Sequence, residues 1–346
     1  MGLLTNIVDN DAFSAITLTE AITELPYTQS RIGELGIFEE EGVATVDIAL
    51  EYEGGRLQFI KSAARGSMPE GITDPKRTLK TLRAPHLPQN GGVMADDVQG
   101  KRVFGAPADG APIQIEMFEA EVAKELMRLK QNHEYTWEYH RMGCLSGKVL
   151  DGDGSTTLYD LFSLYGITRE SFTFTFATTD EVRTKVLALK RGMKKSLGKL
   201  ANQATGIHAF CSDAFFDALV KSADAKTAYN RWQDGQFHRD DYSNALAANG
   251  GFEWLGVHWE NYDNLDGADN PYITSGDCNF IPMGVPGLFK RKNAPAPFIE
   301  AVNTIGLPMY AKQKVNRWET GVEIHTNSNP LHYCLIPSVL KRGVAA

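Results

Sequence analysis

Residues 114–142, QIEMFEAEVAKELMRLKQNHEYTWEYHRM, form a stretch of 29 residues without glycine or proline. As one helix this stretch would be about 44 Å long, far longer than an average helix of about 11–12 residues. Apolar or aromatic side chains recur every three or four residues, which is typical of a helix with one buried stripe. The rest of its surface is charged, and no heptad register is kept, so the pattern predicts a rod packed along one side rather than a coiled coil. The stripe consists of Ile115, Phe118, Val122, Leu126, Leu129, His133 and Trp137.

The composition is that of an ordinary globular protein whose acidic charge is concentrated near the N-terminus. The 346 residues are 42% hydrophobic, which is enough for a substantial core, and no apolar run is long enough to cross a membrane. The four cysteines form no Cys-x-x-Cys pair, which favours free thiols in a reducing compartment. The net charge is −8, and residues 1–45 alone carry −7, from eight acids and Arg31. Such a chain is a poor general binder of nucleic acid.

Alternating and helical patterns surround the rod. The segments 43–52 and 57–62 alternate on either side of Gly54-Gly55 and predict a β-hairpin. Residues 64–112 are rich in proline and glycine, which predicts an outward-reaching loop with a short strand at 78–83. Further strands are predicted at 148–150, 171–176, 207–211, 252–262, 280–283, 310–326 (one long strand) and 331–340, with helices at 178–200, from 213 onward and at 295–305.

The sequence predicts no catalytic, cofactor-binding or metal-binding residues. His133-Glu134 begins a zinc-protease motif, but Trp137 stands where the second histidine is required. No glycine-rich phosphate loop and no nucleophile elbow occurs in the sequence. Two other classes remain open. One is an enzyme whose site is assembled from scattered groups such as His208, Cys211, Asp213 and His258. The other is a nucleic-acid-binding module that uses helix 180–200, whose charge of +5 also suits a solvated face or an acidic protein segment.

Several short segments carry a resemblance to a known family. They are Thr81–Asn90, Asp96-Asp97, Lys101-Arg102, Gly143–Lys148, Thr320–Ile324 and Pro330–Pro337. Together with the order of arm, hairpin, long helix and mixed α/β region, the chain resembles the lambda-type major capsid (head) proteins of tailed phages, which have the Hong Kong 97-type fold.

The resemblance implies an α+β fold with a defined layout. It consists of an N-terminal arm (1–42), a projecting β-hairpin E-loop (43–112), a peripheral domain with the spine helix (113–200 and 309–326) and an axial domain (201–308 and 327–346). In this layout the rod at 114–142 is the spine helix.

The resemblance also implies a structural protein of the virion rather than an enzyme. Copies of the chain would assemble in the host cytoplasm into hexamers and pentamers of an icosahedral head that encloses double-stranded DNA without binding it specifically. Expected partners are other copies of the chain, a separate scaffold protein, a portal and a decoration protein, with no cofactor and no membrane. The acidic arm and the basic helix predict a contact between adjacent subunits, and further contacts are expected from the E-loop. The candidate contact residues are Glu39, Glu40, Glu41, Lys80, Arg83, Lys190, Arg191, Lys194 and Lys195.

Overall fold

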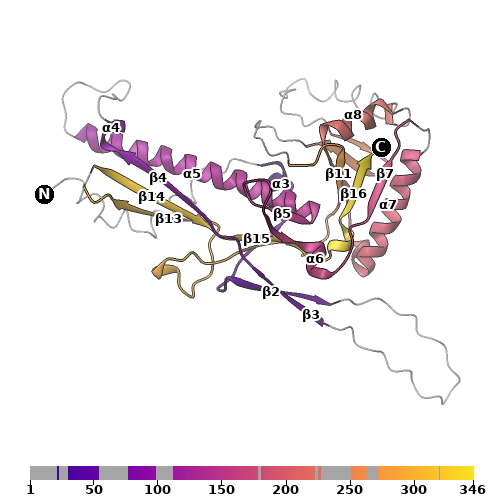
Figure 1. Cartoon of the computed structure of the whole chain (residues 1–346), viewed down its shortest axis with the longest axis horizontal. Helices are drawn as coiled ribbons and strands as arrows, with labels where there is room; N and C mark the ends of the chain where they lie inside the picture. The colour runs from indigo at the N-terminus through magenta and orange to yellow at the C-terminus, as the bar shows by residue number, and fades with distance from the viewer. Residues whose placement is uncertain are drawn as a thin grey trace, which may run out of the picture.

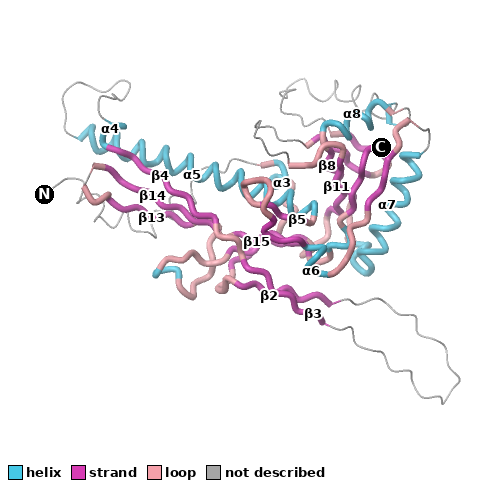
Figure 2. Tube along the Cα trace, viewed as in Figure 1, coloured by secondary structure: helices cyan, strands magenta, loops and turns pink. Residues whose placement is uncertain are grey.

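A long helix joins two regions of β-structure in this protein. The computed structural model describes residues 22, 30–53, 77–98, 112–177, 181–222, 225–226, 251–262, 272–318 and 320–346. Figure 1 shows helix α5 with strands β4, β14 and β13 along one part, and a lobe of strands and helices at its other end. A two-stranded hairpin, β2–β3, leaves the middle of the molecule. Figure 2 shows the same distribution of helix and strand.

The predicted rod is helix α5, Pro112–Ser146. The helix continues through Gly143. A side chain at this position would press against Lys148 and Val149, so the glycine allows strand β5 to pack closely against the helix. The stripe is buried from Phe118 to Trp137. His133 on this stripe is buried, and its Nε2 is 3.0 Å from Thr326 Oγ1, which confirms that it is a packed and hydrogen-bonded residue.

The stripe of α5 packs on a three-stranded antiparallel sheet. Its strands are β13 (Tyr310–Val315), β14 (Gly321–Ser328) and β4 (Leu87–Met94), in the order β13-β14-β4. The prediction of one long strand over 310–326 is wrong, because the chain turns between Val315 and Gly321. Asn316 closes this turn: its backbone N–H donates to Gly321 O (3.0 Å), and its Oδ1 accepts from Thr320 N (2.8 Å).

The described hairpin pairs β2 with a later strand of the chain. Strand β2 (Asp47–Glu53) pairs with β3 (Arg77–Arg83). The predicted partner segment, 57–62, lies outside the described residues, and its pairing stays a prediction. The observed register places Asp47 opposite Arg83 and Glu53 opposite Arg77. Burial of Ile48 and Leu50 fixes which face of the hairpin turns towards the core. The predicted strand at 78–83 is confirmed.

The lobe is built on a six-stranded mixed sheet in the order β7-β16-β11-β8-β10-β9. The strands predicted at 171–176, 207–211 and 280–283 are confirmed, and 252–262 forms two strands. The segment predicted as one strand at 331–340 instead divides between β15 and a 3-10 turn, and β16 follows. The sheet consists of β7 (Ser171–Phe174), β16 (Lys341–Ala345), β11 (Asp277–Met283), β8 (Gly206–Cys211), β10 (Val257–Asn261) and β9 (Phe252–Trp254).

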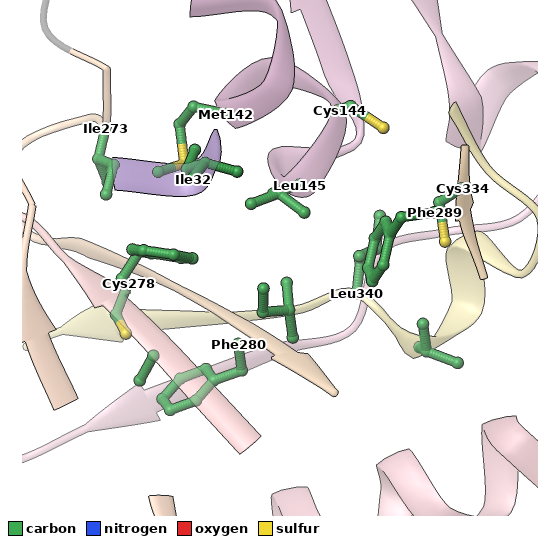
Figure 3. Packing of buried hydrophobic residues seen from close by; sticks show 14 of the residues in the cluster. Ile32, Met142, Cys144, Leu145, Ile273, Cys278, Phe280, Phe289, Cys334 and Leu340 are labelled. Carbon is green, nitrogen blue, oxygen red and sulfur yellow. The ribbon is translucent and has the colours of Figure 1, made fainter. Parts of the chain in front are cut away.

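Helices α7 (Glu181–Leu197) and α8 (Asp213–Lys221) pack on this sheet. The predicted helix at 178–200 is confirmed over α7, while residues 178–180 lie outside the described residues. The segment 295–305, predicted as a helix, contains only a 3-10 turn at Ile299–Ala301. Figure 3 shows the core between the sheet and the end of α5, where Met142 and Leu145 lie near Ile32, Phe280 and other labelled residues.

The remaining elements join these parts. Strand β1 (Glu39–Gly42) is parallel to β12 (Phe289–Asn293), which is antiparallel to β15 (Pro330–Cys334). Strands β5 (Lys148–Leu150) and β6 (Thr157–Asp160) form a small antiparallel ribbon after α5, which confirms the strand predicted at 148–150. The short helices are α3 (Arg31–Glu34), α4 (Ala95–Val98) and α6 (Leu161–Tyr165), and 3-10 turns cover Gly198–Asn202 and Pro337–Val339.

Candidate assembly surfaces

The acidic triplet of the arm forms strand β1 and binds its own chain. In the parallel register, Glu39, Glu40 and Glu41 stand opposite the basic triplet of β12. Glu39 accepts a hydrogen bond from Gly287 N (2.6 Å), and Glu41 lies 3.8 Å from Lys292 Nζ. This intrachain pairing reduces the charge that the triplet could offer to a neighbouring subunit.

Glu40 completes a partly buried cluster of charges. Its Oε1 accepts from Arg291 Nη1 (2.9 Å) and lies 3.4 Å from Arg141 Nη2 of α5. The Arg291 side chain is only 2% exposed, and its guanidinium lies 3.9 Å from the centre of the Trp137 ring. Because an isolated buried charge is costly, Glu40 and the aromatic face together stabilise Arg291 where strand β12 passes helix α5.

Helix α7 presents a basic face to solvent. Its apolar residues from Val182 to Leu197 are buried, and its hydrophobic spacing explains the orientation. Lys190 Nζ donates a hydrogen bond to Leu255 O of the same chain, so it is less available for a contact with another subunit. Arg191, Lys194 and Lys195 are exposed and have no ion pair with any residue that the structure describes. They remain the predicted contact residues best placed to bind an acidic partner.

The hairpin carries the other two predicted contact residues, Lys80 and Arg83. Lys80 pairs in register with Leu50, whose side chain is buried, while Arg83 is exposed opposite Asp47. Ile48 and Leu50 anchor the base of the hairpin in the main core. The described part of the hairpin therefore combines an anchored base with an exposed charge at Arg83.

An exposed aliphatic loop was not predicted from the sequence. The loop between β12 and β13 exposes aliphatic side chains: Ile299 is 92% exposed, Ile305 71% and Val302 63%. The ends of the loop are held together, because Gly306 N donates to Val43 O and Val43 N donates to Asn293 O. The available signal was a proline- and alanine-rich segment with isoleucine or valine at every third residue from 299 to 305.

The groups proposed for an enzyme do not form one site. His208 and His258 are neighbours on β8 and β10, with ring centres 4.8 Å apart. Cys211 is buried beside Cys278 (Sγ–Sγ 3.3 Å), and Asp213 accepts a hydrogen bond from Asn261. Because Cys211 is three residues from His208 along a strand, the two side chains lie on opposite faces of the sheet.

Comparisons with known proteins identify the class. The sequence matches the family described as phage major capsid protein E over residues 14–345. The chain therefore belongs to this family. It is 25% identical to the major capsid protein of Pseudomonas phage KPP10, over 96% of this chain and 97% of that protein. It is 22% identical to the major capsid protein of Salmonella phage Felix O1, over 98% and 97% of the two chains.

Solved structures support the same fold. A protein of a prophage in E. coli CFT073 aligns with a TM-score of 0.55 at 10% identity, over 96% of this chain and 99% of that one. The capsid of an empty GTA particle aligns with a TM-score of 0.51 at 9% identity, over 93% and 92%. The fold is the Hong Kong 97-type capsid fold, as expected from the resemblance.

The chain is a phage major capsid protein, a component of the virion that self-associates into capsids. Neither the enzyme nor the nucleic-acid-binding alternative is supported. Among the described helices, none has the length and apolar character needed to cross a membrane.

Proposed function

We propose that copies of this chain form the hexamers and pentamers of an icosahedral head that encloses double-stranded DNA. The observation that carries this proposal is the exposed aliphatic loop after β12, with Ile299, Val302 and Ile305. Large aliphatic side chains gathered in one loop favour burial against another molecule. Membership of a capsid family makes a second copy of the chain the expected partner.

We further propose the domain layout of the resemblance with one changed boundary. The arm (1–42) and E-loop (43–112) keep their limits, and the spine helix with 309–326 belongs to the peripheral domain. Strand β7 hydrogen-bonds to β16, and α7 packs on the same sheet. We therefore assign 171–200 to the axial domain with 201–308 and 327–346, and leave 113–170 in the peripheral domain.

For the partners, we propose a contact between an acidic segment and the exposed basic face of α7, formed by Arg191, Lys194 and Lys195. The acidic segment would belong to the arm of an adjacent subunit. A separate scaffold protein, a portal and a decoration protein are proposed from the resemblance alone. We propose no catalytic role, because the candidate groups His208 and Cys211 lie on opposite faces of the sheet.

The experiment is assembly of the purified protein, with its scaffold supplied if required, followed by sedimentation and negative-stain microscopy. Wild-type chains should form capsomers or closed shells. An Ile299→Ser/Ile305→Ser variant should reduce shell yield strongly while the unassembled chain keeps its unfolding midpoint, because both side chains are already exposed to water. Ser155→Asp, in the exposed turn after β5, is the matched control. Wild-type yield from the loop variant would remove the loop from the interface, and a strictly monomeric wild-type protein would contradict the proposed assembly.

A further inference from the structure

Three potential metal ligands meet on one face of the axial sheet. Strands β8 and β10 are parallel neighbours, and their register places His258 directly opposite His208. Glu260 follows two residues after His258 and therefore points to the same face. Glu260 Oε2 lies 2.8 Å from His208 Nε2 and 3.9 Å from His258 Nε2. The three donor atoms all lie within 4.8 Å of one another, and no other such group occurs within the described residues.

This donor set suits a first-row transition ion. Two imidazole nitrogens and one carboxylate oxygen form a common set of protein ligands for Zn²⁺ that leaves one position open. With bonds of about 2.0–2.2 Å, the donors of a tetrahedral ion lie about 3.3 Å apart. The two distances to Glu260 Oε2 lie on either side of this value, so small side-chain rotations would bring the donors to bonding distance.

The proposed site is open to solvent on the His258 side. The His258 side chain is 42% exposed, which gives an ion and a fourth, water ligand access from solvent.

Arg31 would act as the positioning residue of the site. Its Nε donates to Glu260 Oε1 at 2.6 Å, and Nη2 donates to Oε2 at 3.1 Å. An ion bound to Oε2 would leave the stronger contact to Oε1 in place, so Arg31 would continue to orient the carboxylate. Its positive charge opposes a second cation, which weakens binding relative to a site without the arginine.

We propose that His208, His258 and Glu260 form a binding site for a divalent first-row transition ion of the Zn²⁺ type, with water as the fourth ligand. The ion would join strands β8 and β10 and, through Arg31, the short helix α3 of the N-terminal segment. The competing interpretation is a metal-free polar cluster in which His208 and Arg31 only hydrogen-bond to Glu260.

Cobalt binding by the full chain distinguishes the two. Protein freed of metal by a chelator would be titrated with Co²⁺, and bound metal and visible absorption would be measured. We expect one Co²⁺ per chain with the intense absorption of a four-coordinate ion. His258→Ala should weaken binding at least tenfold, whereas His86→Ala, at an exposed histidine elsewhere, should not change it. Absence of stoichiometric binding, or equal binding by His258→Ala, would overturn the proposal.

A second measurement on the wild-type chain protects the test against a misfolded variant. Cu²⁺ bound at one equivalent per chain should show hyperfine coupling to two nitrogen ligands in its electron paramagnetic resonance spectrum. A spectrum with oxygen ligands only would mean that His208 and His258 do not hold the ion, and would overturn the proposal without any substitution.

Discussion

Removing the carboxylate of Glu138 should weaken the junction of helix α5, the short helix α3 and the end of strand β10. Glu138 is 2% exposed on α5. Its Oε1 accepts from Ile32 N of α3 (2.7 Å) and from Tyr262 OH after β10 (2.6 Å), and its Oε2 lies 3.3 Å from Arg141 Nη1. In Glu138→Ala, two buried donors lose their acceptor, at about 1–3 kcal/mol each. In this variant Arg141 still donates a hydrogen bond to Ser30 Oγ (3.1 Å) and still forms its ion pair with Glu40.

The expected loss for Glu138→Ala is therefore about 3–5 kcal/mol in the free energy of unfolding. Glu138→Gln keeps an acceptor oxygen and should lose about half as much. The assay is urea unfolding of the unassembled chain, where the midpoint should fall at an unchanged slope. Lys124→Ala is the control, because Lys124 is 76% exposed in a surface ion pair worth less than about 1 kcal/mol. A loss below about 1 kcal/mol for Glu138→Ala would refute this account of the junction.

Two further predictions concern helix α5. Burial lowers the pKa of both His133 and His140 to about 4. The unfolded chain, with histidine pKa values of about 6.5, then binds more protons, so stability is complete above pH 6.5 and falls as the pH drops towards 4. Each histidine contributes about 1.4 kcal/mol per pH unit. His140→Gln should make the urea midpoint less dependent on pH, by the contribution of one histidine, and parallel profiles for His140→Gln and wild type would contradict this. Leu129→Ala, at a fully buried position, should cost about 2–5 kcal/mol by urea unfolding, and a loss within 0.5 kcal/mol of the Lys124→Ala value would contradict the packing of the stripe.

Local patterns predicted the elements better than their partners. The rod was predictable because its stripe keeps a helical period over many turns, and β7 and β8 because each alternates or runs apolar over its whole length. The partner of β2 was missed because Gly54-Gly55 is a strong local turn signal. The observed register brings together residues far apart in the sequence, such as Asp47 and Arg83, and no local pattern marks such a pairing. The turn at 316–320 was missed because it contains neither glycine nor proline.

The buried polar junctions could not be predicted from the sequence. Glu138 lies on a helix face that the sequence leaves polar, and only the packing of α3 and Tyr262 converts that face into an interior. The acids at 39–41 pair with basic residues about 250 positions later, on β12. No periodic pattern in the sequence predicts such a pairing. His208 and His258 were noticed as isolated candidates, but Glu260 was not, because their convergence depends on the parallel register of β8 with β10.

The intrachain pairing of β1 changes which acids could reach the basic face of α7. Glu39–Glu41 already face β12, and Glu34 pairs with Arg31 at 3.4 Å. The four remaining acids of the arm lie outside the described residues and are the other candidates for this contact: Asp9, Asp11, Glu20 and Glu24. Changing these four to their amides should reduce shell yield, increasingly at low ionic strength, without changing the unfolding midpoint. Glu40→Gln should instead lower the midpoint, because Arg291 loses its counter-charge. If the four-amide variant assembles like wild type at every salt concentration, the arm does not bind α7 by charge.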